Sequence, residues 1–178
     1  MDIKSWFDLK KIYIIVFITL AGWSFFAYFT MTKLIHSQEI YAKIINLSGK
    51  QRMLSQKTTL IAKRYFEEED ESLKIHLKEL IDIMKADHTY IIKNLPSKII
   101  KDIYYKEPLK LNEKVLDYIY LLNTFYNKPT KELLNILEKS SFSLLPNLEK
   151  SVNLFEKESE EKTRILLDRE NFILMGKF

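Results

Sequence analysis

The sequence predicts an all-α protein in which an N-terminal transmembrane helix continues into an up-down-up-down four-helix bundle. Three observations predict this fold class. The 178 residues include only three glycines and four prolines, so turn formers are too sparse for many short strands. Residues 12–29 form an uninterrupted uncharged run. In the segments that follow, apolar residues recur at spacings of three and four, which is typical of amphipathic helices.

The uncharged run predicts a single membrane span. At about 1.5 Å per residue it covers about 27 Å, close to a hydrocarbon core of about 30 Å. Lysines on its leading side place residues 1–11 in the cytoplasm, residues 12–30 in the membrane and residues 31–178 outside. A cleaved signal peptide is the alternative. It is disfavoured because its apolar region would hold about 7 to 15 residues and end in small residues, whereas residues 25–31 are bulky.

Composition excludes several classes of protein. Cysteine is absent, so there is no disulfide framework, thiolate metal site or cysteine nucleophile. The formal charge of +4 is spread along the chain, and no basic arm for nucleic acid is present. His88 could serve a haem, but His36, His76 and His88 all lack the Glu-x-x-His spacing of di-iron bundles. We expect no metal, no cofactor and no enzyme, because catalytic constellations and phosphate loops are missing.

Residues 40–66 carry two neighbouring stripes at helical spacing. The first is mostly apolar and is expected to face the core of the bundle: Ile40, Ile44, Leu47, Gln51, Leu54, Thr58, Ile61 and Tyr65. The second has small residues around one arginine: Tyr41, Ile45, Ser48, Arg52, Ser55, Thr59, Ala62 and Phe66. Small side chains allow another helix to approach, and a guanidinium suits carboxylate, nitrate or phosphate. Arg52 therefore implies a partner anion, either a ligand or an acidic residue of a neighbouring helix.

Residues 45–57 read Ile-Asn-Leu-Ser-Gly-Lys-Gln-Arg-Met-Leu-Ser-Gln-Lys. This segment resembles the signature of the PilJ-type sensor domain, the N-terminal module of type IV pilus chemotaxis transducers. It is also similar to the ligand-binding box of nitrate and nitrite sensor kinases. The resemblance implies a homodimer through the first helix, with Arg52 of both subunits binding a small anion. The candidate ligand-binding residues are Arg52, Gly49, Ser48, Ser55 and Lys57. Lys57 falls where the kinases have arginine, and lysine cannot form a bidentate fork.

The first helix is expected to run from the membrane to about Phe66. Gly49 inside it costs up to about 1 kcal/mol relative to alanine, which close approach of a second chain or of the ligand would explain. A basic ridge follows the same helix at seven-residue spacing, through Lys43, Lys50, Lys57 and Arg64. This ridge is either a solvated face or a surface that attracts anions.

An acidic loop at residues 67–71 precedes the second helix, which is expected at about residues 73–94 with Asp70 or Ser72 as its N-cap. Pro96 stops it. Residues 97–107 are too apolar for a free linker, and they predict a short helical turn, an extended cover or a flexible cap near the ligand. The third helix is expected to start at Asn112 as N-cap and to fill the core with its aromatic residues Tyr118, Tyr120, Phe125 and Tyr126.

Thr130 is expected to cap a helix over residues 131–142, and Pro146 predicts a break near Ser143. A last helix over residues 146–175, whose start also resembles the PilJ-type domain, would return toward the membrane. The charge run at residues 156–162 is either a solvated face or a source of acidic partners for Arg52.

Charged residues 168–170 interrupt the C-terminal segment, and only residues 172–175 follow as an apolar run, so a second span does not fit. We therefore expect either the front part of a longer receptor or a sensor without a transmitter.

Three function classes follow. The first is an extracytoplasmic sensor domain of a bacterial inner-membrane receptor, located in the periplasm. It would bind a small anion such as nitrate or nitrite at a dimer seam and transmit a helix displacement across the membrane. The second is a membrane-anchored helical scaffold that dimerises or holds a partner without a ligand. The third, an enzyme, is the least favoured. Kinase, chemotaxis transducer and cyclic-dinucleotide enzyme remain open as output modules, because all three use such front ends.

Overall fold

The computed structural model describes the backbone of residues 3–174 and the side chains of residues 10–168. The described part of the chain is helical and contains no strand, which confirms the all-α prediction. It has five helices: the segments expected as separate helices at residues 131–142 and 146–175 form one helix, and a short helix lies between the second and third expected helices. They are α1 (Ile3–Glu68), α2 (Glu71–Lys93), α3 (Lys98–Tyr105), α4 (Leu111–Asn127) and α5 (Lys131–Leu174). By its contacts the chain divides into two units, residues 1–39 and residues 40–178, which are described separately.

The unit of residues 1–39 holds the first part of α1. Its most apolar 18-residue window has a mean hydropathy of 2.0, and none of the side chains in that window is buried. Hydroxyl groups along it donate to the carbonyl four residues earlier, as Thr19 does to Ile15 at 2.8 Å and Thr30 to Phe26 at 3.0 Å. Polar atoms in such a helix are thus satisfied internally, as hydrocarbon surroundings require. By length and composition, this helix is able to cross a membrane.

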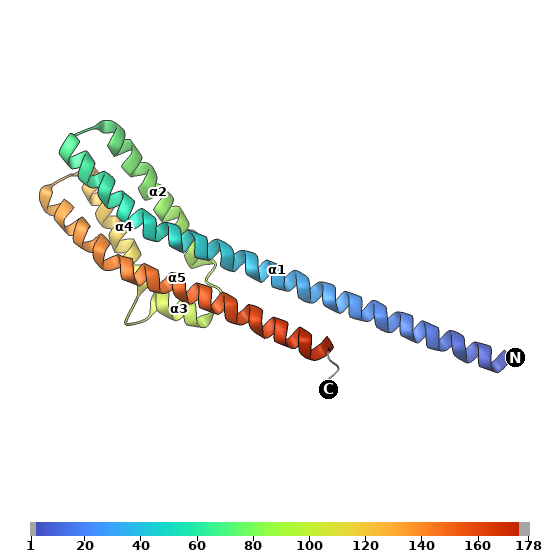
Figure 1. The fold of residues 1–178 in the computed structure, drawn as a ribbon. Helices are drawn as coiled ribbons and strands as arrows, with labels where there is room; N and C mark the ends of the chain where they lie inside the picture. Colours follow the sequence, from blue (N-terminus) through green and yellow to red (C-terminus); the bar gives the residue numbers. More distant parts are fainter. Residues whose placement is uncertain (1–2, 175–178) are drawn as a thin grey trace. The chain divides into compact units, whose positions relative to one another are not determined.

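The unit of residues 40–178 packs α2, α4 and the first part of α5 with residues 40–68 of α1, and the short α3 lies against α4 and α5 (Figure 1). One continuous apolar core joins all five helices. Its fully buried members include Ile44, Leu77, Met84, Val115, Leu122, Phe125, Leu148 and Phe155. The first stripe of α1 faces this core as predicted, with Ile40 and Leu47 only partly covered.

Local capping signals explain several helix ends. The carboxylate of Asp70 accepts from the backbone N–H of Ser72 at 2.8 Å and caps α2. The hydroxyl of Thr130 accepts from the N–H of Leu133 at 3.2 Å at the start of α5. Ser97 caps α3 by accepting from the N–H of Ile100 at 3.2 Å. Of the three alternatives for residues 97–107, the structure therefore has the helical one, a short helix with its own cap.

The predicted N-cap of the third helix is wrong. The helix α4 begins at Leu111, and its N-cap is Lys110, which has a positive φ of 40° and makes no side-chain cap bond. The side chain of Asn112 is engaged elsewhere, because its Oδ1 lies 2.9 Å from Nε2 of His88. Asn112 therefore hydrogen-bonds to another helix and does not cap α4.

The predicted break near Ser143 is also wrong, because α5 continues through Pro146. Proline removes the N–H that would bond to the carbonyl of Phe142. Phe142 is 82% exposed, so water can satisfy that carbonyl without a break in the helix. The side-chain amide of Asn147 also donates to the carbonyl of Ser143 at 2.8 Å. The predicted end at Met175 lies outside the described residues.

The prediction that Tyr120 fills the core is wrong, because its side chain points away from the core. Tyr118 and Phe125 fill the core, but Tyr120 is 75% exposed. Two residues along a helix correspond to a rotation of about 200°, so Tyr118 and Tyr120 face opposite sides. Leu116 also faces solvent for this reason, since it too is two positions from Tyr118.

Candidate functional site

The signature segment, residues 45–57 of α1, has three polar side chains that face the interior of their own chain, and Thr58 continues their stripe. Ser48, Gln51, Ser55 and Thr58 are all fully buried on α1. Successive members are three or four residues apart, so they form one stripe that lies against the other helices. Two of the five predicted ligand residues, Ser48 and Ser55, therefore belong to the core of a single chain.

Ser55 is the point at which α4 and α5 are tied to α1. The hydroxyl of Tyr118 donates to the Ser55 carbonyl at 2.6 Å, and the hydroxyl of Ser141 donates to the same oxygen at 2.8 Å. The Tyr118 oxygen also lies 2.8 Å from the hydroxyls of Thr58 and Thr59. Burial raises the pKa of Tyr118, and the neighbouring hydroxyls oppose this effect. These contacts hold the signature segment in a fixed register against the rest of the unit.

A second polar cluster lies nearer the start of the signature segment. Tyr104 of α3 is buried beside the hydroxyls of Ser48 and Ser151, and burial raises its pKa to about 12. Neither the Ser48 hydroxyl nor the amide of Gln51 has a well-formed hydrogen bond to a described protein atom. Each such group costs about 1–3 kcal/mol when it is left unpaired in an interior.

His88 is a neutral packing residue. Its ring packs against the ring of Tyr104, with ring centroids 6.4 Å apart, and its Nε2 lies 2.9 Å from Oδ1 of Asn112. Burial lowers the pKa of His88, more than the Asn112 hydrogen bond raises it. Within the described part of the chain, His, Asp and Glu residues form no group of three that could hold a metal ion. The other ring nitrogen of His88, Nδ1, is buried and has no hydrogen-bond partner among the described atoms, so the ring is only partly satisfied.

Arg52 lies at the surface of the unit. Its Nη1 pairs with Oε2 of Glu149 on α5, and the two side chains are 43% and 46% exposed. The acidic partner thus comes from a neighbouring helix, but from Glu149 and not from the charge run at residues 156–162. Because both groups stay in contact with solvent, the remaining guanidinium donors of Arg52 are accessible to an anion.

Gly49 lies on the same outer face, three residues before Arg52. A Cβ built on Gly49 would meet no atom within 4 Å, so the backbone is open to an approaching helix. Lys57 is exposed but sits five residues beyond Arg52, on a different face of the helix. The structure therefore leaves Arg52 and Gly49 partly exposed, buries Ser48 and Ser55, and places Lys57 on a different face of the helix.

The basic ridge is mostly engaged within the chain. Lys50 pairs with Asp87 at 2.9 Å, Arg64 pairs with Glu68 at 2.9 Å, and the ammonium group of Lys43 lies 4.1 Å from the ring centre of Tyr90. Lys43, Lys57 and Arg64 are exposed, as expected of a solvated face.

An apolar strip adjoins the Arg52 face. Met53 and Leu60 of α1 are about half exposed, and Leu60 lines a shallow groove with Phe142 and Leu145 of α5. Lys63 and Glu138 form an ion pair at 3.6 Å and also line this groove. Such a strip on α1, beside an open glycine, is suited to contact with another helix.

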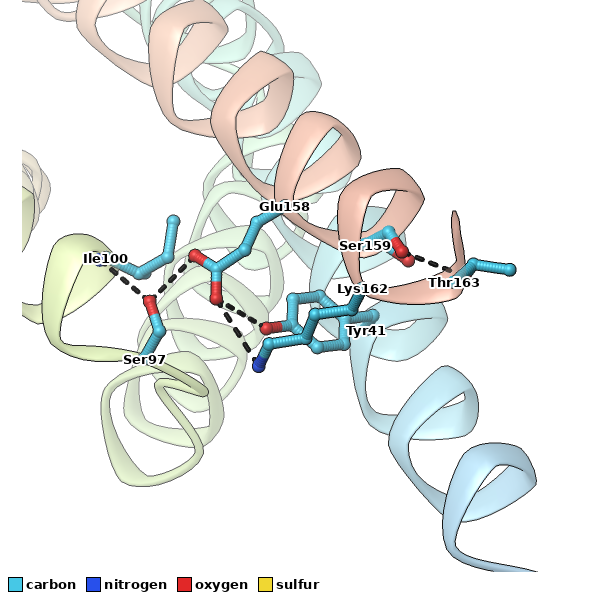
Figure 2. A network of polar contacts seen from close by, with 7 residues as sticks. All are labelled: Tyr41, Ser97, Ile100, Glu158, Ser159, Lys162 and Thr163. Carbon is cyan, nitrogen blue, oxygen red and sulfur yellow. Dashed lines mark hydrogen bonds and ion pairs between the residues drawn. The ribbon is translucent and has the colours of Figure 1, made fainter. Parts of the chain in front are cut away.

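A carboxylate in the charge run has a structural role that the sequence did not indicate. Figure 2 shows Glu158 between three elements: it accepts from the hydroxyls of Tyr41 and Ser97 at 2.7 Å each, and it pairs with Lys162 at 3.5 Å. Burial raises the pKa of Tyr41, and the hydrogen bond and negative charge of Glu158 raise it further. The spacing of Glu158 from Ser151 and Phe155, seven and three residues, is the signal that could have placed it on the buried face.

Comparison of the chain with protein-family models, with curated proteins and with solved structures finds no match.

Proposed function

We propose that residues 40–178 form a four-helix sensor domain that binds a small anion at Arg52. Residues 12–30 would anchor it in a bacterial inner membrane, with the domain in the periplasm. The observation that carries this proposal is the position of Arg52: it is half exposed, beside an open glycine, on the segment that resembles the PilJ-type signature. A buried and fully paired arginine would have favoured a purely structural role.

The anion would compete with Glu149 for the guanidinium. A planar oxyanion such as nitrate or nitrite suits the paired donors of arginine, and it carries the same sign of charge as the carboxylate that it displaces. If the bound anion replaces the Glu149 carboxylate at Arg52, the ion pair that joins α5 to α1 is lost. Since α1 also carries the apolar stretch of residues 12–29, a displacement of this helix is the proposed signal.

Two copies would meet through the face that holds Gly49, Met53 and Leu60. Two guanidinium groups at that seam repel unless an anion lies between them, so binding would favour one arrangement of the two first helices. The second candidate function is a membrane-anchored scaffold in which Arg52 serves only its pair with Glu149. That pair favours the scaffold, because it satisfies Arg52 within one chain.

Anion-dependent stability of the full chain in detergent separates the two functions. Nitrate, nitrite, phosphate, sulfate and acetate would be compared by thermal unfolding at constant ionic strength. One anion, at about a hundred times its dissociation constant, is expected to add about 2.7 kcal/mol to the free energy of unfolding. Arg52→Ala should abolish this gain. In Glu149→Gln the same gain in the free energy of unfolding should be reached at a lower anion concentration, because the carboxylate that competes for Arg52 is gone.

The scaffold function predicts a different pattern for the same variants. No anion would stabilise the chain, and Arg52→Ala and Glu149→Gln would behave alike in every buffer. Each would lower the free energy of unfolding by no more than about 1 kcal/mol, since the pair is half exposed.

Gly49→Ala tests the proposed seam. In a single copy the new methyl group meets no neighbour, and alanine favours the helix, so monomer stability should rise by about 0.5–1 kcal/mol. In a dimer that packs through Gly49, the methyl group would push the helices apart and weaken association. Sedimentation equilibrium in density-matched detergent measures the association, and thermal unfolding measures the stability. Lys85→Ala, at an exposed position on α2, is the matched control. An unchanged association constant for Gly49→Ala would place the seam elsewhere.

A further inference from the structure

A groove between α4 and α5 is distinct from the Arg52 face. It is open to solvent, has a volume of ≈ 540 Å³ and shares no lining residue with the groove beside Leu60. A volume of this size lies within the range of about 300–1,000 Å³ that is usual for small-molecule sites. Its floor is apolar, formed by the buried Leu144 and the partly buried Leu121.

One wall of the groove carries a charge of each sign. Lys114 and Asp117 are three residues apart on α4, so they project from the same side of the helix. They do not pair with each other. The Lys114 ammonium group contacts Oδ1 of Asn147 at 3.4 Å, and no ion pair of Asp117 with a described side chain is formed. The lining of the groove therefore carries one ammonium group and one carboxylate next to apolar side chains.

This arrangement selects against ligands of a single charge. A small anion at Lys114 would be repelled by Asp117, and a small cation at Asp117 would be repelled by Lys114. A molecule that carries both charges close together satisfies both residues at once. Across the groove, the hydroxyl of Ser143 donates to the Ser140 carbonyl at 3.0 Å, which leaves its oxygen free to accept a hydrogen bond.

We propose that this groove binds a small zwitterion, of which a free α-amino acid is the simplest. Its carboxylate would contact Lys114 and its ammonium group would contact Asp117, while its side chain would cover Leu121 and Leu144. The site goes beyond the anion function proposed above, because it uses other residues and prefers a ligand that carries both charges. Its failure would leave the Arg52 site unaffected.

The groove also has a direct connection to the signature segment. Tyr118 contributes to the lining, and its hydroxyl donates to the carbonyl of Ser55 on α1 at 2.6 Å. A molecule bound above Tyr118 would restrict the side chain that joins α4 to α1. Occupancy of the groove is therefore expected to stabilise the helix around Ser55.

Calorimetric titration of the full chain in detergent with each standard L-amino acid tests the proposal. At least one amino acid is expected to bind, and ammonium acetate at the same concentration is not, because its two charges are not linked. Lys114→Gln and Asp117→Asn should each weaken binding by about tenfold or more, as the loss of a charge-assisted hydrogen bond predicts. Both positions are exposed, so both variants should keep the melting temperature of the unliganded protein. Arg52→Ala should bind as the unmodified chain does.

Three results would overturn the proposal. These are no binding of any amino acid up to about 10 mM, equal binding of ammonium acetate, or unchanged affinity in Lys114→Gln and Asp117→Asn. Hydrogen exchange provides the second readout. The amides of residues 55–59 should exchange more slowly with the amino acid bound, and an unchanged rate would overturn the connection through Tyr118.

Discussion

Between about pH 10 and pH 12 the free energy of unfolding is expected to fall steeply. Burial raises the pKa of Tyr104 to about 12, and it also raises the pKa of Tyr118 and of Tyr41. In the unfolded chain these phenols ionise near about pH 10. Above that pH the unfolded state has released protons that the folded state still holds, so folding becomes less favourable as the pH rises.

The size of this loss follows from the pKa of Tyr104. One retained proton costs about 1.36 kcal/mol per pH unit, so Tyr104 alone accounts for up to about 2.7 kcal/mol across the window. Below about pH 10 its contribution is fully present. Tyr118 adds to the loss in the same direction, so the combined effect exceeds that of most single substitutions.

Urea unfolding of the full chain in detergent, at half-unit steps of pH, measures this loss. Tyr104→Phe should show a shallower decline, because one of the retained protons is gone. Tyr120→Phe is the matched control, since it removes a phenol from an exposed position on the same helix bundle. Parallel declines for Tyr104→Phe and the unmodified chain would mean that Tyr104 ionises normally in the folded protein.

The helices could be predicted from the sequence because their signals are local. Apolar spacing fixed which residues of α1 and α2 face the core, and short-range caps at Asp70 and Thr130 marked two helix starts. Two predicted helix boundaries failed for reasons that the local sequence does not carry. Asn112 has the chemistry of an N-cap but contacts His88 of another helix. Pro146 has the chemistry of a helix break but lies on an exposed side of α5, where the helix continues.

The candidate site was predictable only in part. Helical spacing placed Arg52 and the small residues on one stripe. It did not indicate which of these residues would be buried by other helices of the same chain. Ser48 and Ser55 are covered, and Arg52 is not. The partner of Arg52 lies 97 residues away in the sequence, at a register between α1 and α5 that only packing determines. The same holds for Tyr118, which reaches Ser55 from 63 residues away.

The signature segment thus has two faces with different chemistry. Its inner face is a row of buried polar side chains, tied to α4 and α5 at Ser55 and poorly paired near Gln51. Its outer face presents Arg52 and Gly49 to solvent. The hydrogen bonds at Ser55 fix the register of α1 against α4 and α5. The proposed sensor would therefore have to change these contacts if α1 is displaced on binding.

Glu158→Ala is expected to lower the free energy of unfolding by about 2–4 kcal/mol. Two hydrogen bonds to a charged acceptor are lost, and the buried hydroxyl of Tyr41 is left without its partner. The change also frees Ser97, the cap of α3, so α3 should unfold locally before the rest of the unit. Urea unfolding measures the first effect, and hydrogen exchange of residues 98–105 measures the second.

Two further variants separate the charge of Glu158 from its shape. Glu158→Gln keeps one acceptor oxygen, so its loss of stability should be smaller than that of Glu158→Ala, and it should bring the pKa of Tyr41 closer to its ordinary value by removing the negative charge. Glu156→Ala changes an exposed carboxylate of the same charge run and should alter stability by no more than about 0.5 kcal/mol. If Glu156→Ala and Glu158→Ala behave alike, the run is a solvated face throughout, and Glu158 does not join α1, α3 and α5.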